Sequence, residues 1–330
     1  MDLNLLWFVL LGVLLAGYSI LDGFDLGAGI LHLTARTDDE RRTIINAIGP
    51  LWDGNEVWLV TFGGAMFAAF PVAYATVFSG FYIALMLVLL TLILRAVSIE
   101  FRSKRASLGW RRFWDGSFFL GSLLATLLFG VALGNILIGI PIDANGIFTG
   151  SFFTLLRPFP ILVGLFTVLF AAMHGALYLN LKTEGELQQR MRVWIKRSFN
   201  CAAVCFVLMA ICVLLFVPVV KVWMWGIFIC VAFLAIPRVL SQNRPFIAFL
   251  LSSAIIAVLV FLFSFALYPN LVISNISPEY NLNIVNAASS AKTLGVMTWI
   301  AAIGVPIVLI YTAAIYRIFR GKVKLTKHSY

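Results

Sequence analysis

Residues 246–268 read FIAFLLSSAIIAVLVFLFSFALY, which is 23 residues without one charged side chain. A helix of about 20 apolar residues is long enough to cross the hydrocarbon core of a bilayer. Hydrophobic residues make up 62% of the whole chain and charged residues 12%, whereas ordinary soluble domains have about 45–50% and about 25%. The sequence therefore predicts an all-α integral membrane protein and excludes an ordinary soluble one.

On both sides of that run, charged or Pro-containing breaks divide the chain into nine predicted membrane spans. They cover residues 4–33, 51–70, 75–98, 115–139, 158–181, 198–217, 220–237, 246–268 and 294–316. Only residues 218–221 separate the sixth span from the seventh, so these two spans must form a tight hairpin. No internal repeat and no soluble segment of domain size is evident, and residues 1–330 are predicted to form a single membrane domain.

The distribution of basic residues tests this topology independently of hydropathy. Twenty of the 24 lysines and arginines lie in the segments that follow the first, third, fifth, seventh and ninth spans. The opposite segments contain three, Arg157, Lys221 and Lys292. Because basic residues concentrate in cytoplasmic loops, the alternation predicts an N-terminus outside and a cytoplasmic C-terminus. It also explains the net charge of +10 without a nucleic-acid partner.

A short polar segment lies between the first two predicted spans. Residues 37–48 read TDDERRTIINAI, with Thr37 or Asp38 as the N-cap and acidic residues in the first turn. This pattern is typical of a helix N-terminus. We expect a short amphipathic helix on the cytoplasmic membrane surface.

Ionisable residues inside the predicted spans are the strongest functional signal. A charge in hydrocarbon costs at least about 2.5–3.5 kcal/mol, so such residues need a reason to be there. Asp22 and Asp25 share one face of the first span, and Asp53 and Glu56 repeat that spacing in the second. The others are Arg95, Glu100, Asp115 and His174. All map toward the predicted cytoplasmic side, which indicates a protonatable cluster reachable from the cytoplasm.

The acidic residues of the first two spans have both a functional and a structural interpretation. Burial and a nearby arginine shift the pKa of a carboxyl group in opposite directions, so such a group can be poised to exchange protons. Asp25 and Asp53, with Asp22 and Glu56 beside them, are therefore predicted to conduct cytoplasmic protons inward. A purely structural role for Asp25 and Asp53 stays open.

For the remaining ionisable residues we expect structural roles. Arg95 is expected to be a counter-ion of the buried acids. Glu56, Glu100 and Asp115 are expected to be interface residues or to extend toward the membrane surface. His174 could be a haem ligand, but the spans hold no second well-placed histidine, so we expect a hydrogen bond between helices.

Small residues accompany these acids. Gly23 and Gly27 form a small-xxx-small pattern in the first span, and the pair Gly63 and Gly64 continues it in the second. Such residues are expected to let neighbouring helices approach closely.

These residues lie in segments that resemble subunit II of the cytochrome bd-type quinol oxidases. Residues 22–27 (DGFDLG) are similar to the first-helix motif of that family, and residues 41–58 (RRTIINAIGPLWDGNEVW) to its most distinctive segment. Arg95 and residues 78–82, 101–104, 134–135, 296–299 and 306–311 match further along. The similarity spans nearly the whole chain.

The resemblance implies a haem-free subunit of an electrogenic, oxygen-reducing quinol oxidase in the bacterial cytoplasmic (inner) membrane. In this family a larger subunit I holds two b-type haems and one d-type haem, oxidises quinol and reduces oxygen to water. Subunit II is required for assembly and contributes to the proton route. Positions matching Asp25, Trp52, Asp53 and Arg95 are regarded as important.

The resemblance also implies a fold and further binding partners. The family fold consists of two four-helix bundles plus one peripheral helix. A quinone occupies a structural position in some members, and the presence of small accessory subunits or a dimer is left open. At residues 218–222 the chain lacks a longer insertion of the best-known members, which suggests the cyanide-insensitive-oxidase-like branch.

Two other classes of protein stay open at this point. A purely structural assembly subunit would tolerate neutral residues at Asp25 and Asp53 without loss of turnover. A secondary transporter would also carry acids in its helices, but it predicts inverted repeats and charged sites near the membrane midplane, and neither is evident.

Overall fold

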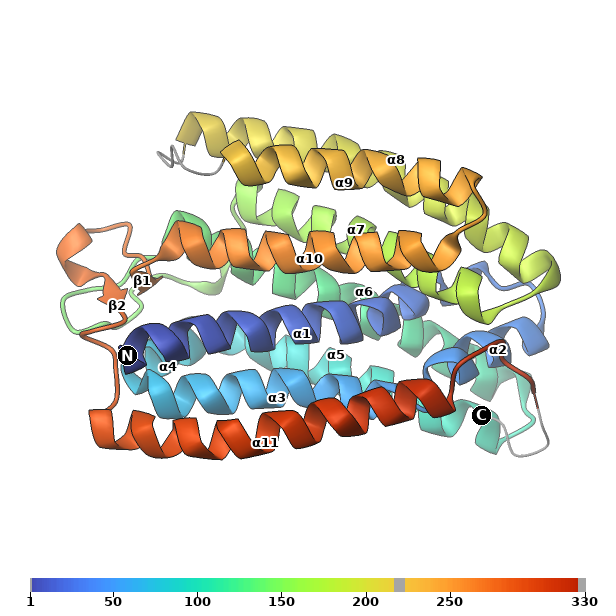
Figure 1. Cartoon of the computed structure of the whole chain (residues 1–330), viewed down its shortest axis with the longest axis horizontal. Helices are drawn as coiled ribbons and strands as arrows, with labels where there is room; N and C mark the ends of the chain where they lie inside the picture. Colours follow the sequence, from blue (N-terminus) through green and yellow to red (C-terminus); the bar gives the residue numbers. More distant parts are fainter. Residues whose placement is uncertain (1, 217–222, 326–330) are drawn as a thin grey trace.

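Long apolar helices lie side by side along the longest dimension of the molecule (Figure 1). The structure is a computed structural model, and it describes residues 2–216 and 223–325. The α-helices are α1 (Leu3–Leu31), α2 (Asp38–Ile48), α3 (Trp52–Ala69), α4 (Pro71–Gly80), α5 (Tyr82–Phe101), α6 (Leu108–Ile138), α7 (Pro158–Lys182), α8 (Gly185–Phe216), α9 (Trp223–Ser241), α10 (Pro245–Leu267) and α11 (Ala291–Ile318). Four short 3₁₀ helices, η1 (His32–Thr34), η2 (Arg102–Lys104), η3 (Phe152–Leu155) and η4 (Pro278–Tyr280), and the antiparallel strands β1 (Asn270–Val272) and β2 (Leu282–Asn283) complete the fold.

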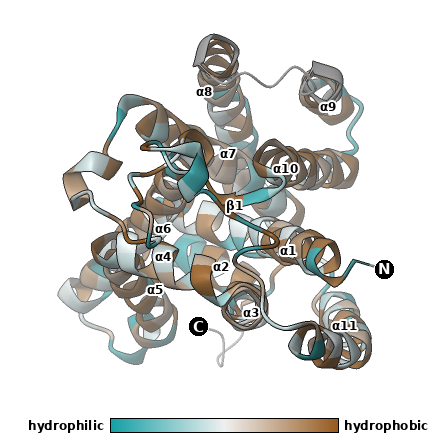
Figure 2. Ribbon diagram, turned by 90° about the vertical axis from the view of Figure 1, so that its left-hand side faces the viewer, coloured by the Kyte–Doolittle hydropathy of each residue, from teal (hydrophilic) through white to brown (hydrophobic). Residues whose placement is uncertain are grey.

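Seven helical segments of the described chain are long and apolar enough to cross a membrane. They are Leu3–Thr34, Tyr82–Lys104, Leu108–Ile138, Pro158–Lys182, Gly185–Val213, Pro245–Leu267 and Ala291–Ile318. Hydrophobic residues dominate their ribbons (Figure 2). The predicted all-α protein with many apolar spans is confirmed.

Two of the nine predicted spans are not among these seven. The span at 51–70 corresponds to α3, whose first turns carry Asp53, Asn55 and Glu56 and are therefore too polar. The span at 220–237 falls on α9, whose apolar described part, Ile229–Ser241, is short. The predicted hairpin at 218–221 lies outside the described residues. The count of nine spans stays a prediction.

Helix boundaries differ from the predicted spans at three places. The predicted span 75–98 is interrupted at Phe81, whose backbone (φ −96°, ψ 16°) separates α4 from α5. Helix α6 begins at Leu108 rather than at residue 115, and α8 begins at Gly185 rather than at 198. The residues before those two apolar runs are charged, but proline is absent from them, so the helices continue beyond the apolar part.

The connections between helices gather at two opposite ends of the molecule. The N-terminus and the β1–β2 pair lie at one end, and α2 and the described end of the chain lie at the other (Figure 1). At the first end, Ile140 N donates to Ile273 O (3.0 Å) and Asn275 N to Ile140 O (3.1 Å). At the second, Val323 N donates to Lys182 O (2.9 Å), so the segment after α11 returns to the end of α7.

Helix α1 is the central element, and it contacts α3, α6, α7 and α10. A Cβ atom at Gly27 would lie 2.0 Å from the carbonyl oxygen of Ala171, and one at Gly175 would lie 2.4 Å from the Gly27 carbonyl carbon. The crossing of α1 and α7 therefore requires both glycines. At Gly63 and Gly64, by contrast, an added Cβ would meet no atom within 4 Å in the described chain. The expectation of a close helix approach at this pair is wrong within the chain, because both residues lie away from the other helices.

Helix α2 forms where the sequence predicted it. Thr37 accepts a hydrogen bond from Glu40 N and Glu40 accepts one from Thr37 N, which is a capping box. Its apolar residues Ile44, Ile45 and Ile48 are almost completely buried in the largest core cluster. Its apolar face thus packs against the helices of its own chain, and the position of α2 on the cytoplasmic membrane surface stays a prediction.

Candidate functional site

Asp22 on α1 and Arg95 on α5 form a buried ion pair. Asp22 is 0% exposed and Arg95 1%. Arg95 Nη1 donates to Asp22 Oδ2 (2.9 Å) and Nη2 donates to Oδ1, so the two planar groups pair through two bonds. The pairing offsets the cost of removing both charges from water. It connects α1 to α5 at the level where the acidic residues gather.

Asp25 is also completely buried, and the described chain offers no basic group within ion-pair distance of it. Its Oδ2 accepts a hydrogen bond from Asn55 Nδ2 (2.7 Å), whereas Oδ1 has no partner among the described residues. Asn55 also donates to Leu21 O (3.2 Å) and accepts from the hydroxyl of Tyr316 (3.0 Å). Helices α3 and α11 thus hold one oxygen of Asp25 in place and leave the other free to bind a proton or a water molecule.

The second pair of predicted acids is divided by the geometry of α3. Glu56 is half-buried and interacts electrostatically with Arg95 and Asp22. Asp53 is exposed, because it lies on the side of α3 opposite to the buried Asn55. The structure therefore brings Asp22, Asp25 and Glu56 together around Arg95. The expectation that Asp53 is buried is wrong within this chain.

Trp52 and Glu100 lie on the same two helices as Glu56 and Arg95. Trp52 begins α3, is half-buried and packs against the largest core cluster. Glu100 lies near the end of α5 and is half-buried. Neither side chain contacts the Asp22–Arg95 pair through a hydrogen bond in the described structure.

His174 on α7 is hydrogen-bonded on both sides of its ring. Nε2 lies 3.1 Å from the carbonyl oxygen of Ile20, and Nδ1 lies 2.7 Å from the Ser252 hydroxyl. A carbonyl can only accept, so Nε2 carries a proton, and Nδ1 faces the Ser252 hydroxyl, which also lies within hydrogen-bond distance of Phe249 O (2.7 Å). The ring also stacks on Phe249 at 4.8 Å. With both nitrogens engaged by α1 and α10, this geometry is that of a contact between helices and leaves no nitrogen for a haem iron.

A second group of buried charges surrounds Asp115 at the start of α6. Its carboxylate accepts from Arg41 Nη1 (2.7 Å) and Arg102 Nε (2.5 Å), and it lies 2.6 Å from His32 Nε2. Arg102 also reaches Asp38 (2.7 Å). The expectation that Asp115 is an interface residue or extends toward the surface is wrong, since it is 1% exposed. It instead joins α2, η1, η2 and α6 at the end of the bundle.

Sequence reasoning missed three residues that the structure places among the acids. Asn55 and Tyr316 hold Asp25, and His32 lies beside Asp115. One signal was available for His32, because a spacing of seven residues after Asp25 puts both on one helix face. No comparable signal links Tyr316 to Asn55, which precedes it by 261 positions.

The arrangement combines a fully paired buried carboxylate with a partly unpaired one. No group of three or more His, Cys, Asp or Glu within residues 2–216 and 223–325 could hold a metal ion. One buried carboxylate, Asp25, has an unpaired oxygen next to a fully paired one, Asp22. The two carboxylates share no hydrogen bond, so a change at the free oxygen of Asp25 breaks no bond of the Asp22–Arg95 pair.

Comparisons with known proteins agree over nearly the full length. The family model of cytochrome bd terminal oxidase subunit II matches residues 3–319. The cytochrome bd-I ubiquinol oxidase subunit 2 of Escherichia coli strain K12 is 37% identical, and the alignment covers 99% of this chain and 98% of that protein. The cytochrome bd ubiquinol oxidase subunit 2 of Bacillus subtilis strain 168 is 34% identical, with 98% and 97% covered.

A solved structure shares the fold. A chain of the bd oxidase from Geobacillus thermodenitrificans superimposes with a TM-score of 0.78 at 18% identity, and the match covers 97% of this chain and 99% of that one.

Proposed function

This chain belongs to the cytochrome bd terminal oxidase subunit II family, and on that premise we propose that it admits cytoplasmic protons to a quinol:oxygen oxidoreductase. It is part of an oxidoreductase complex with a subunit I partner and is a multi-pass protein of the inner membrane. In this proposal the two b-type haems, the d-type haem and quinol oxidation belong to the partner. This chain supplies a scaffold and part of the inlet for the protons that oxygen reduction consumes.

The single observation that carries the proposal is the state of Asp25. Its side chain is fully buried and holds one oxygen without a partner in the described chain, although a cation pairs with its neighbour Asp22. A buried acceptor without a hydrogen-bond partner costs free energy of folding, so its presence calls for an explanation. Reversible binding of a proton by the Asp25 carboxylate would explain why this oxygen is left without a partner.

The outer face of α3 is where the partner subunit is proposed to bind. Asp53, Gly54 and Gly64 are exposed on it, and an added Cβ at either glycine would meet no atom within 4 Å. Small residues on an outward face allow a second polypeptide to approach closely. A partner there would cover Asp53, and protons could then pass from Asp53 and Glu56 toward Asp25.

We further propose the finer architecture that the charge distribution and the family resemblance predict. Nine helices span the membrane as one domain, in two four-helix bundles plus a peripheral helix. Helix α11 fits the peripheral position, because most of its side chains are exposed and its main contacts are with α1 and α3. The N-terminus lies outside, and α2 and the segment after α11 lie in the cytoplasm. A structural quinone stays a prediction from the resemblance.

The test replaces Asp25 by Asn in the complete oxidase. We expect normal haem spectra, and turnover and proton uptake lower by at least about tenfold, since a positioned proton-transfer group typically contributes about a hundredfold or more. Asp39→Asn is the matched control, because it makes the same chemical change at an exposed carboxylate (82% exposed) near the same end. Full turnover together with full proton uptake in the Asp25→Asn complex would contradict the proposal.

A purely structural subunit is the second candidate function. The fully paired Asp22 and Asp115 favour it, because their hydrogen bonds connect helices and leave no oxygen free. This candidate predicts that Asp25→Asn keeps full turnover per assembled complex, so that Asp25→Glu has no lost turnover to recover. Recovery with Asp25→Glu would exclude it.

A further inference from the structure

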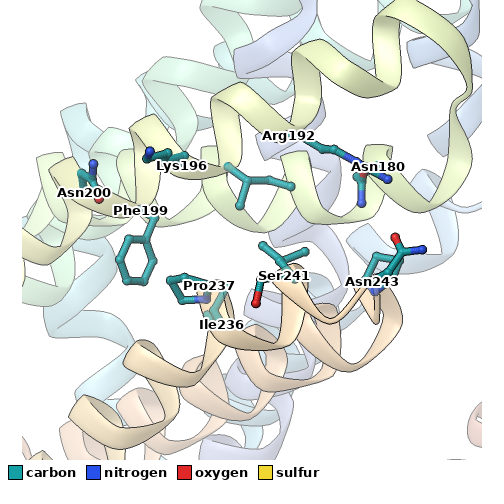
Figure 3. Close-up of a pocket in the computed structure, with 12 residues that line it drawn as sticks. Asn180, Arg192, Lys196, Phe199, Asn200, Ile236, Pro237, Ser241 and Asn243 are labelled. Carbon is teal, nitrogen blue, oxygen red and sulfur yellow. The ribbon is translucent and has the colours of Figure 1, made fainter.

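A cavity of about 350 Å³ opens between α7, α8, α9 and α10 (Figure 3). It lies at the end of the molecule that carries α2, and none of the acids around Arg95 lines it. Its floor is apolar and includes the buried Ile195 and Ile236 together with Phe199 and Pro237. Polar and basic side chains form its walls.

The cavity exists because α8 and α9 stand apart. Helix α8 packs on α7 and α9 packs on α10, whereas the ribbons of α8 and α9 diverge (Figure 2). Two aromatic contacts to Phe233 of α9 bridge them, a close stack of Phe199 (ring centroids 4.5 Å apart) and a longer one of Phe206 (6.5 Å). Phe199 also lines the cavity, so this stack closes the space toward the middle of the helices.

Two cations on the cavity wall lack an acidic partner. Arg192 and Lys196 lie one turn apart on α8, and the described chain places no carboxylate within ion-pair distance of either. No acidic residue lines the cavity. Lys322 lies close to this wall without lining the cavity, since it interacts electrostatically with Glu184 and Arg192 and donates to the backbone oxygens of Asn180 (3.3 Å) and Thr183 (2.6 Å). The wall therefore carries excess positive charge next to an apolar floor.

Asn180 provides an independent sign of a ligand. It is 1% exposed and lines the cavity, and its amide points into the open space (Figure 3). Its Oδ1 accepts only a long hydrogen bond from Arg192 Nε (3.5 Å), and its Nδ2 donates none within the described chain. Because this amide faces the cavity and has no acceptor within the described chain, it is available to donate to a bound ligand.

We propose that this cavity binds the phosphate headgroup of an anionic phospholipid. The cavity lies where α7 and α9 end and α8 and α10 begin, so the proposed orientation of the apolar helices puts it at the depth of a lipid headgroup layer. Arg192 and Lys196 pair with the phosphodiester, Asn180 donates to one of its oxygens, and the apolar floor takes the first carbons of the chains. A volume of about 350 Å³ admits a headgroup and leaves the acyl tails in the bilayer. A quinone ring has no charge to pair with the two cations.

The experiment uses the complete oxidase complex, purified and depleted of lipid. Phosphatidylglycerol, phosphatidylcholine or inorganic phosphate is added, and native mass spectrometry counts the bound molecules while thermal unfolding is followed. We expect one retained phosphatidylglycerol and a raised unfolding temperature. Arg192→Gln combined with Lys196→Gln should weaken this binding about tenfold or more, because two charge-assisted bonds are lost. Ser241→Trp fills the cavity from an exposed position and should abolish the binding without changing the charge.

The control variant combines Arg197→Gln with Arg238→Gln. It removes two positive charges from exposed positions on α8 and α9 that do not line the cavity, so phosphatidylglycerol binding should match the wild type. Equal binding by the Arg192/Lys196 variant would overturn the proposal. So would the same stabilisation by inorganic phosphate alone, which indicates a free-anion site, or a quinone retained there in place of the lipid.

Discussion

Glu40 connects α2 to the long helix α8 through a single carboxylate. Its Oε2 accepts hydrogen bonds from Arg190 Nη1 (2.7 Å) and from the backbone N of Arg36 (2.6 Å). Burial acts to raise the pKa of Glu40, but the hydrogen bonds from Arg190 and Arg36 outweigh it and hold the pKa below its ordinary value. Glu40 lies outside the predicted spans, so its titration is accessible from water.

The stability of the chain should therefore depend on pH through Glu40. A lowered folded-state pKa contributes stability that is fully present above the unfolded pKa of about 4.3 and is lost as the pH falls through the folded value. The unfolding temperatures of wild type and Glu40→Gln should thus differ most above pH about 5 and converge below about 4. The exposed Glu186 provides the control, because Glu186→Gln should leave the profile unchanged. A difference that grows toward acid would contradict the assignment.

At the scale of single residues, the sequence identifies charges better than it identifies their partners. Asp22, Asp25 and Arg95 stand out because a charge in hydrocarbon is costly wherever the helix lies. The pairing of Asp22 with Arg95 and of Asp25 with Asn55 depends on which helices adjoin α1, and helix periodicity gives only the face. Asp115 was misjudged for the same reason, since its partners His32 and Arg41 come from the far end of α1 and from α2.

At the scale of elements, apolar runs predict where helices lie but not where they end. Residues 246–268 became α10 with one residue of difference at each end, because proline and a polar turn bound that run. Helix α8 begins well before its apolar run, because residues 185–197 are good helix formers and also carry charge. The helix break at Phe81 could not be predicted in this way, because no proline lies at residue 81 or beside it.

The crossing of α1 and α7 is the element contact most sensitive to a small change. An added Cβ at Gly27 would overlap the backbone of α7, which cannot move without displacing the whole helix. Gly27→Ala should therefore destabilise the complex by about 1–3 kcal/mol or more, seen as a lower unfolding temperature and a lower yield of assembled oxidase. Gly116→Ala is the matched control, since a Cβ there meets no atom within 4 Å. Equal stability of the two variants would show that the crossing is looser than the structure indicates.

At the scale of the whole molecule, the hydropathy pattern constrains the fold more than residue identity does. A TM-score of 0.78 at 18% identity means that most side chains differ while the helices keep their places. The charge distribution predicts a side for each connection, and the structure collects alternate connections at opposite ends. Side-chain packing, such as Gly27 against Ala171, decides which helices become neighbours. The hydropathy pattern carries no information about these contacts.

The proposed orientation can be tested by labelling single cysteines in intact cells. The four native cysteines are first replaced. Asn275→Cys and Ser107→Cys then place exposed thiols at opposite ends of the molecule. A membrane-impermeant thiol reagent should label Asn275→Cys directly, because residues 268–290 are proposed to lie outside. Ser107→Cys should react only after permeabilisation, since five basic residues surround it between residues 102 and 112 and favour the cytoplasm. The reverse pattern would invert the topology and place Asp25 near the outer surface, out of reach of cytoplasmic protons.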